Sequence, residues 1–147
     1  MTDKIMFYHL HEPYGEFSNF ARFPIELKGK IWPTSEHYFQ AQKFAGNEHE
    51  EAIRNAATPR EAFIMGKDRT HPLRPDWETV KEDVMREAVM AKFSQHAGLR
   101  DLLLNTGDAQ LVEHTKNDTY WADGEDGSGL NRLGIILMEI REKLKAE

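Results

Sequence analysis

Three residues with reactive or hydrogen-bonding side chains, Glu36, Gln40 and Lys43, are spaced so that a helix would align them. At about 100° per residue, positions four and seven apart return to the same helix face, and Phe39 falls at its edge. A carboxylate, an amide and an amine in line beside an aromatic ring can form the wall of a pocket. The same spacing also fits a solvated helix face that carries a glutamine and a spaced ion pair. On spacing alone, both interpretations stand.

A second unusual pattern lies in the segment 77–95, where a long helix is predicted. Lys81 and Lys92 fall in the middle of its apolar face, which is formed by Trp77, Val80, Val84, Ala88 and Ala91. A lysine there either extends its ammonium to water or meets a carboxylate or a ligand phosphate. Because an unpaired buried ammonium is costly, we expect Lys92 to be functional. Trp77 is either a core anchor or a stacking platform.

The third pattern is an aromatic pair, Tyr120 and Trp121, followed by a glycine-rich acidic segment up to Gly129. Glycine lets a backbone approach a ligand closely. The segment is not a P-loop, because no Gly-Lys-Ser/Thr follows and its acids would repel phosphate. Its spacing does not match a calcium loop either. A plain surface loop is the alternative interpretation.

Composition excludes several classes of protein. The 147 residues are 39% hydrophobic and 30% charged, which is typical of a globular chain with a continuous core. No apolar run approaches the roughly 20 residues of a membrane helix, so we expect no membrane partner. The absence of a signal peptide pattern and of cysteine favours a cytoplasmic protein without disulfide or thiolate chemistry. The net charge of -6 argues against a protein that coats nucleic acid, but not against an enzyme that acts on one modified nucleotide.

Metal and serine chemistry have little support in this sequence. Its 7 histidines form no His-Glu-x-x-His pattern and have no cysteine partners. No Gly-x-Ser-x-Gly elbow marks a nucleophilic serine. We therefore expect an activity that needs no metal and no cofactor.

The elements that must position these residues are mostly helical. A strand is predicted over Lys4–Leu10 and a hairpin over Ile25–Trp32. Helices are predicted from Ser35 to Gly46, Asn47 to Ala57, Pro59 to Gly66, Trp77 to Gln95, Gly98 to Thr106 and Asn131 to Lys145, with a short strand over Leu111–His114. Thr34 or Ser35, Asn47, Thr58 and Asp76 are the expected N-caps. The prediction is one α+β domain over residues 1–147, dominated by helices, with short N-terminal strands.

Several runs of the chain, taken in order, resemble the NADAR family, also called YbiA-like. These runs are Gly15–Phe20, Trp32–Phe44, Met65–Arg69, Ala91–Phe93, Leu111–His114 and Asn131–Gly134. The resemblance covers the chain from about Phe7 to Arg141, and the run Trp32–Phe44 is long and specific. One departure is Ala122, which stands where the family commonly has glycine.

The resemblance implies an N-glycosidase that releases an exocyclic amine from a ribosyl carbon. Its implied substrates are phosphoribosylamino-pyrimidine intermediates of riboflavin biosynthesis and ADP-ribose attached to guanine in nucleic acid. The implied catalytic residues are Glu36, Lys43 and Asp123. Substrate binding is expected of Asn19, Phe20, Gln40, Arg69, Trp77, Lys92, Trp121 and Gly124.

The chemistry of that reaction suits these residue types. Breaking a ribosyl C–N bond builds positive charge on the ring oxygen and the anomeric carbon, which a fixed carboxylate such as Glu36 stabilises. Lys43 would act as the general acid, or as an amine that attacks the opened ribose aldehyde. Arg69 would hold phosphate through bidentate contacts, and Trp77 or Trp121 would stack the base or ribose.

Two other functions fit parts of the same pattern. A non-catalytic module that binds ADP-ribose or a nucleotide would keep Trp77, Arg69 and the glycine-rich loop, but would not need Glu36. A structural interaction protein would expose an apolar patch and tolerate changes at all of these positions. We expect an enzyme.

Overall fold

The computed structural model describes residues 3–147, which form two compact units. One unit is Arg22–Lys92, and the other combines the described residues up to Ala21 with Phe93–Glu147. That the chain is one functional domain stays a prediction.

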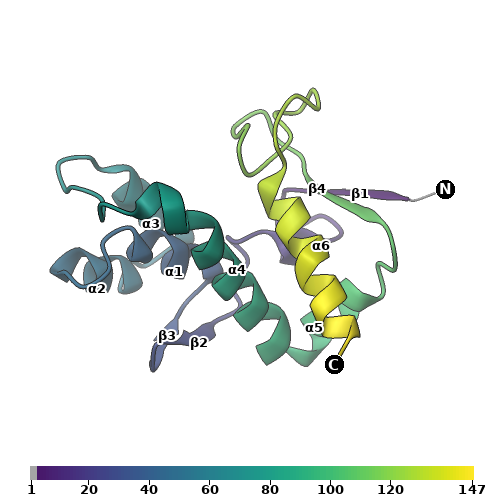
Figure 1. The fold of residues 1–147 in the computed structure, drawn as a ribbon, viewed down its shortest axis with the longest axis horizontal. Coiled ribbons are helices and arrows are strands. Elements are labelled where there is room, and N and C mark those ends of the chain that lie inside the picture. Colours follow the sequence, from purple (N-terminus) through teal and green to yellow (C-terminus); the bar gives the residue numbers. More distant parts are fainter. Residues whose placement is uncertain (1–2) are drawn as a thin grey trace. The chain divides into compact units, whose positions relative to one another are not determined.

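The unit Arg22–Lys92 contains a hairpin and four helical segments (Figure 1). The hairpin pairs β2 (Ile25–Leu27) with β3 (Lys30–Trp32) in antiparallel register, Ile25 opposite Trp32. The helices are α1 (Ser35–Gln42), α2 (Glu48–Arg54), α3 (Pro59–Lys67) and most of α4 (Trp77–Gln95). The predicted hairpin and all four helices are therefore confirmed.

Three side-chain caps explain why the first helices begin where they do. Thr34 accepts from the His37 N–H at 3.1 Å, Asn47 from His49 at 2.8 Å and Thr58 from Glu61 at 3.0 Å. Each satisfies one of the backbone donors that a helix leaves unpaired at its start. Asp76 differs, because its carboxylate accepts from Arg74 at 2.6 and 3.0 Å, while its backbone carbonyl accepts from the first turn of α4.

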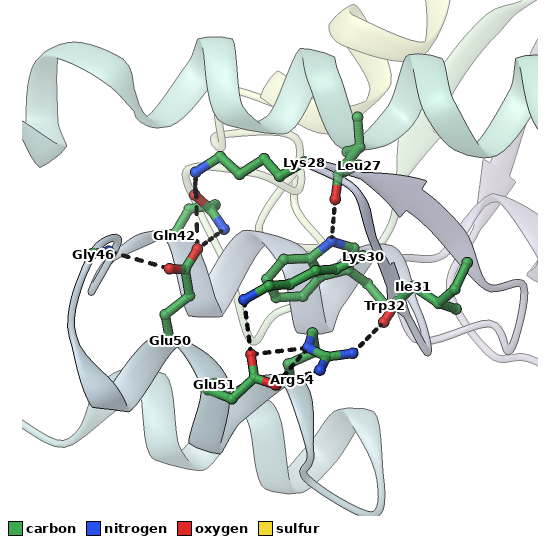
Figure 2. Close-up of polar contacts among 10 residues, drawn as sticks. All are labelled: Leu27, Lys28, Lys30, Ile31, Trp32, Gln42, Gly46, Glu50, Glu51 and Arg54. Atoms are coloured by element: carbon green, nitrogen blue, oxygen red, sulfur yellow. Dashed lines mark hydrogen bonds and ion pairs between the residues drawn. The ribbon is translucent and has the colours of Figure 1, made fainter.

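A polar network ties the hairpin to α2 and to the end of α1 (Figure 2). The Lys30 ammonium donates to Glu51 at 3.1 Å, and Arg54 pairs with Glu51 and donates to the Ile31 carbonyl at 3.0 Å. On the other side, Lys28 donates to Gln42, whose amide donates to Glu50 at 2.8 Å. These contacts hold the hairpin beside the helix that carries Glu36.

Every residue of α1 from Ser35 to Gln42 is buried, because the helix packs against α2, α3 and β3. The interpretation of the Glu36 face as solvated is therefore wrong. The helix is also shorter than predicted, since it ends at Gln42 and residues 43–46 form turns. Gly46 does have the predicted left-handed conformation, with a φ of 91°, although the helix ends four residues before it.

The second unit is built around a two-stranded parallel sheet that the sequence patterns did not pair. β1 (Lys4–Phe7) runs beside β4 (Gln110–Glu113), with α6 (Arg132–Lys145) packed on β4 (Figure 1). The strand predicted over Lys4–Leu10 ends at Phe7, where the chain turns towards the short 3-10 helix η1 (Gly15–Phe17). α5 (Ala97–Leu104) packs on α6.

Asn131 closes the outer edge of β4. Its side chain donates to the Leu111 carbonyl at 2.9 Å and accepts from the Glu113 N–H at 3.0 Å, as a neighbouring strand would. The residue has a φ of 51°, which asparagine tolerates better than most residues. An asparagine before α6 therefore acts as a sheet partner, not as a helix cap. The architecture confirms the predicted α+β class, dominated by helices with short strands.

Candidate active site

The predicted pocket wall on α1 is a buried polar row. Glu36, Gln40 and Lys43 are only 6, 4 and 8% exposed. The Gln40 amide donates to the Glu36 carboxylate at 2.7 Å, which confirms that the two side chains share one helix face. The other oxygen of the Gln40 amide, Oε1, is buried without a hydrogen-bond partner. An acceptor left open in this way is uncommon in a protein interior and is costly unless a ligand or water completes it.

Lys43 directly follows α1 and has its ammonium in the same region. Its Nζ donates to the Gly66 carbonyl at 3.3 Å and lies 5.9 Å from the centre of the Phe39 ring. Within residues 3–147 this ammonium makes no ion pair with a carboxylate. Burial and the nearby Arg69 lower the pKa of Lys43 to about 8, although the Glu36 carboxylate opposes that shift. A lysine poised near neutral pH can give up or take a proton during a reaction.

The Gly66 carbonyl at the end of α3 joins two cations. It accepts from Lys43, and it also accepts from Arg69 Nη1 at 2.7 Å. A side chain at Gly66 has no room, since an added Cβ would lie 1.9 Å from Gln40 Oε1. The absence of a side chain at position 66 therefore brings α3 close enough for its carbonyl to reach Lys43. Sequence reasoning had not given Gly66 a role, although it falls inside the run Met65–Arg69.

Trp77 begins α4 and packs on the aromatic edge of the same cluster. Its ring centre lies 5.2 Å from that of Phe39, with an angle of 60° between the planes, and the residue is 5% exposed. This contact fits the interpretation of Trp77 as a core anchor. Its predicted role in stacking a ligand stays untested.

The two lysines on the apolar face of α4 have different surroundings. Lys81 pairs with Glu78 at 2.9 Å and keeps 19% of its side chain exposed, so its ammonium reaches the surface. Lys92 is 1% exposed, with its ammonium 5.9 Å from the centre of the Phe23 ring. The alternative that Lys92 extends to water is therefore wrong. Its predicted contact with substrate stays untested.

Asp123 lies in the other unit and is 5% exposed. Its carboxylate accepts from His114 Nδ1 at 2.7 Å, from the Glu125 N–H at 2.8 Å and from the Thr115 N–H at 3.2 Å. Burial alone would raise its pKa, but these hydrogen bonds outweigh burial and hold the pKa below its usual value. The carboxylate is therefore ionised and organises its own loop. Its predicted catalytic role stays untested.

The loop geometry does not require a glycine at position 122. Ala122 is fully buried, and it is not among the residues with positive φ. Gly124 does need its freedom, with a φ of 72°. Trp121 is half-buried, and its ring contacts Tyr120 edge to face at 4.8 Å. The alanine at position 122 therefore fits the loop without backbone strain.

Asn19 and Phe20 also belong to this second unit, just after η1. Asn19 is 7% exposed and Phe20 is half-buried, with the Phe20 N–H donating to Ser18 at 3.1 Å.

The structure gathers Glu36, Gln40, Lys43 and Arg69 into one connected cluster. The remaining candidates, Asn19, Phe20, Trp121, Asp123 and Gly124, are positioned by the other unit.

Two general properties of the described chain bear on the chemistry. Residues 3–147 contain no helix that is long and apolar enough to cross a membrane. Over the same range, no group of three or more His, Asp or Glu side chains is arranged to hold a metal ion. That catalysis is independent of metal stays a prediction.

Comparison with known proteins identifies the family. A NADAR domain model matches residues 6–145. The chain is 59% identical to N-glycosidase YbiA of Escherichia coli (strain K12), covering 100% of this chain and 92% of that protein. The NMR structure of E. coli YbiA matches the fold with a TM-score of 0.92 at 58% identity, over 99% of this chain and 88% of that one. The chain belongs to the NADAR domain family.

Two more distant relatives carry informative names. N-glycosidase Npun_R5314 of Nostoc punctiforme is 46% identical, over 96% of this chain and 92% of that protein. Riboflavin biosynthesis protein VVA0006 of Vibrio vulnificus is 41% identical over 99% of this chain, which spans only 40% of that longer protein. The names of the full-length relatives support an enzyme over a non-catalytic binding module.

Proposed function

We propose that this chain hydrolyses the bond between a ribosyl carbon and an exocyclic amine, with Glu36 and Lys43 as its catalytic pair. The class of enzyme follows from the relatives: the chain is an N-glycosidase, a hydrolase that acts on N-glycosyl compounds. The residue roles and the substrates are the proposal.

The observation that carries the proposal is the incomplete hydrogen bonding of the buried polar row formed by Glu36, Gln40 and Lys43. A buried ammonium with a pKa of about 8 and a buried amide oxygen without a partner lie on the face that also carries a carboxylate. In a row that served only the fold, these groups would be expected to find partners, as buried polar groups usually do. A ligand with both donor and acceptor groups, such as a ribose, would complete them.

Glu36 is proposed to stabilise the cation that forms as the C–N bond breaks. Water adds to the anomeric carbon, the hydroxyl stays on the ribose, and a proton goes to the departing amine. The carboxylate is fixed in place by the Gln40 amide, so it needs little reorganisation during the reaction.

Lys43 is proposed to protonate the departing amine, or to add to C1 of the ring-opened ribose. In the second case the exocyclic amine leaves and a Schiff base with Lys43 remains, which water then hydrolyses to the free ribose. Both roles need an amine that exchanges its proton near neutral pH, which the lowered pKa provides. Arg69 uses Nη1 for the Gly66 carbonyl, and its other N–H groups are proposed to bind a substrate phosphate.

The proposal includes the two substrate classes that the resemblance to the NADAR family implies. One is a phosphoribosylamino-pyrimidine intermediate, which the name of the V. vulnificus riboflavin biosynthesis protein supports. The other is ADP-ribose attached to guanine, free or in nucleic acid. Both present an exocyclic amine on a heteroaromatic ring as the leaving group.

The test is to incubate the purified chain with each substrate class and to follow free ribose phosphate or ADP-ribose by mass spectrometry. We expect release from at least one class, and a loss of about 10³-fold in turnover for Glu36→Gln, which keeps the shape and removes the charge. Glu48→Gln, an exposed position at the start of α2, is the matched control and should behave as the parent. A Glu36→Gln protein with parental turnover would exclude the proposed role. If neither class is cleaved, the substrate assignment is wrong.

A further inference from the structure

His114 directly follows β4, and Asp123 fixes the orientation of its ring. Its Nδ1 lies 2.7 Å from Asp123 Oδ2, while Oδ1 of the same carboxylate accepts from two backbone N–H groups, those of Thr115 and Glu125. An ionised carboxylate only accepts hydrogen bonds, so the proton in this pair belongs on His114 Nδ1. A neutral His114 therefore presents the lone pair of Nε2 away from Asp123.

That imidazole lines a cavity of about 400 Å³ within the same unit. This volume lies in the range of small-molecule sites. The His114 side chain is 38% exposed, and its Nε2 has no hydrogen-bond partner among residues 3–147. When His114 is neutral, the cavity therefore has a hydrogen-bond-accepting nitrogen in its wall.

The other groups in the wall are mostly acceptors and aromatic rings. Glu12 and Glu125 contribute carboxylates, against a single lysine, Lys116. Asn117 donates from its Nδ2 to the Tyr8 hydroxyl at 3.1 Å, and its side-chain carbonyl oxygen can act as an acceptor. The Tyr8 and His9 rings meet edge to face at 4.9 Å and supply aromatic surface.

We propose that this cavity is a binding site for a flat heteroaromatic ring rich in N–H donors, such as guanine or a diaminopyrimidine. Acceptors in the wall match the amino and imino hydrogens of such a ring, and the aromatic side chains match its faces. The carboxylates of Glu12 and Glu125 in the wall disfavour a phosphate group. Choosing a nucleobase among such rings rests on the proposed function, because its substrates carry these bases.

The variant His114→Asn tests whether His114 binds a ligand or only stabilises the loop. Asparagine at position 114 can still donate its amide N–H to Asp123, but it has no atom in place of Nε2. His114→Asn is therefore expected to keep the loop and to lose the acceptor. His11→Asn is the matched control, because His11 is exposed and does not line the cavity.

The experiment is a titration of the full chain with guanosine, followed by the backbone amide signals of Tyr8, Thr115 and Asn117 in NMR. We expect saturable shifts at these positions, about tenfold weaker binding in His114→Asn, and parental binding in His11→Asn. Thermal unfolding of the His114→Asn protein should match the parent. Unchanged guanosine affinity in His114→Asn, or no shift at these amides at millimolar guanosine, would overturn the proposal.

A second arm uses ribose 5-phosphate in place of guanosine. We expect the cavity amides not to respond to it, and a larger response to it than to guanosine would overturn the assignment of a base. Binding is measured without turnover, so the two proposals can fail separately. Guanosine binding without any hydrolysis would remove the proposed substrates alone, whereas hydrolysis with no shift in the cavity would remove this site alone.

Discussion

The polar face of α1 and the loop around Asp123 both bury charged groups, but they satisfy them differently. On α1, the Lys43 ammonium has one carbonyl acceptor at 3.3 Å, and the Gln40 Oε1 has no partner. In the loop, Asp123 accepts three hydrogen bonds from its own unit, at 2.7, 2.8 and 3.2 Å. Burial correspondingly lowers the pKa of Lys43, which favours its neutral form. Hydrogen bonds keep the pKa of Asp123 below its usual value, which favours its charged form.

This difference separates two uses of a buried charge. A carboxylate saturated by local donors stabilises a loop and orients a neighbour, here His114, because its interactions are already complete. An ammonium with few partners destabilises the free protein and is available to a ligand. The two units therefore differ in how far the fold itself satisfies the charged groups that it buries.

Replacing Lys43 by Met should have the largest effect on the α1 side of the comparison. The methionine keeps most of the apolar stem and removes the amine, so we expect turnover to fall about 10³-fold, equivalent to about 4 kcal/mol in the barrier. Steady-state kinetics on a cleaved substrate measures this loss. Lys143→Met, on the exposed side of α6, is the control. Turnover within a factor of three of the parent would show that Lys43 takes no part in the chemistry.

Replacing Asp123 by Ala should cost stability in the loop. The variant leaves His114 and two backbone N–H groups without their charged acceptor, so we expect the free energy of unfolding to drop by about 3 kcal/mol. Urea denaturation of the parent and the variant gives the value. Asp126→Ala is the control, since that exposed carboxylate accepts from Ser128 alone and should cost about 0.5 kcal/mol. Equal losses in both variants would contradict the structural role of Asp123.

Replacing Lys92 by Met tests whether the most buried lysine of α4 belongs to the chemistry. It is 1% exposed, and we expect a loss of about 10²-fold in turnover with little change in thermal stability. The measurement is turnover at low and at saturating substrate, together with a melting curve. If the Met protein matches the parent at both concentrations, Lys92 is not a site residue.

The pH dependence of stability should report the amine on α1. The pKa of Lys43 falls from 10.5 to about 8 in the folded chain, chiefly through burial. Between these values the unfolded chain binds more protons than the folded chain, so stability increases as the pH rises through this window. Between about pH 7.5 and about pH 9.5, the free energy of unfolding of the parent should rise by about 2 kcal/mol relative to that of Lys43→Met. A constant difference between the two proteins across this range would contradict the lowered pKa.

Replacing Gly66 by Ala should produce the smallest effect and test the packing behind the cluster. The new methyl group overlaps Gln40 Oε1 and must displace that side chain, at a cost of about 1–2 kcal/mol in stability. Adding Gln40→Ala should remove most of this cost, so the two substitutions will not be additive. A chemical denaturation cycle over the parent, the two single variants and the double variant measures the coupling. If the stability losses of the two single variants simply add in the double variant, the Gln40 side chain is not the reason why position 66 needs glycine.

The sequence determined the local elements and the α1 row. The caps at Thr34, Asn47 and Thr58 were predictable because a helix start is satisfied by side chains only a few residues away. The alignment of Glu36 with Gln40 followed from helical periodicity. The hairpin over Ile25–Trp32 was likewise local.

Only the tertiary structure decided how these elements are buried and paired. The parallel pairing of β1 with β4 joins residues about a hundred positions apart, and no periodicity signals it. The burial of all of α1 depends on α2, α3 and β3, which is why spacing alone left a solvated face as an alternative. The Gly66 carbonyl and the His114–Asp123 pair arise from packing of segments that are separate in sequence. A pattern of residue types fixes which side chains share a helix face, but the number of partners each one finds, and so its pKa, depends on what the rest of the chain packs against it.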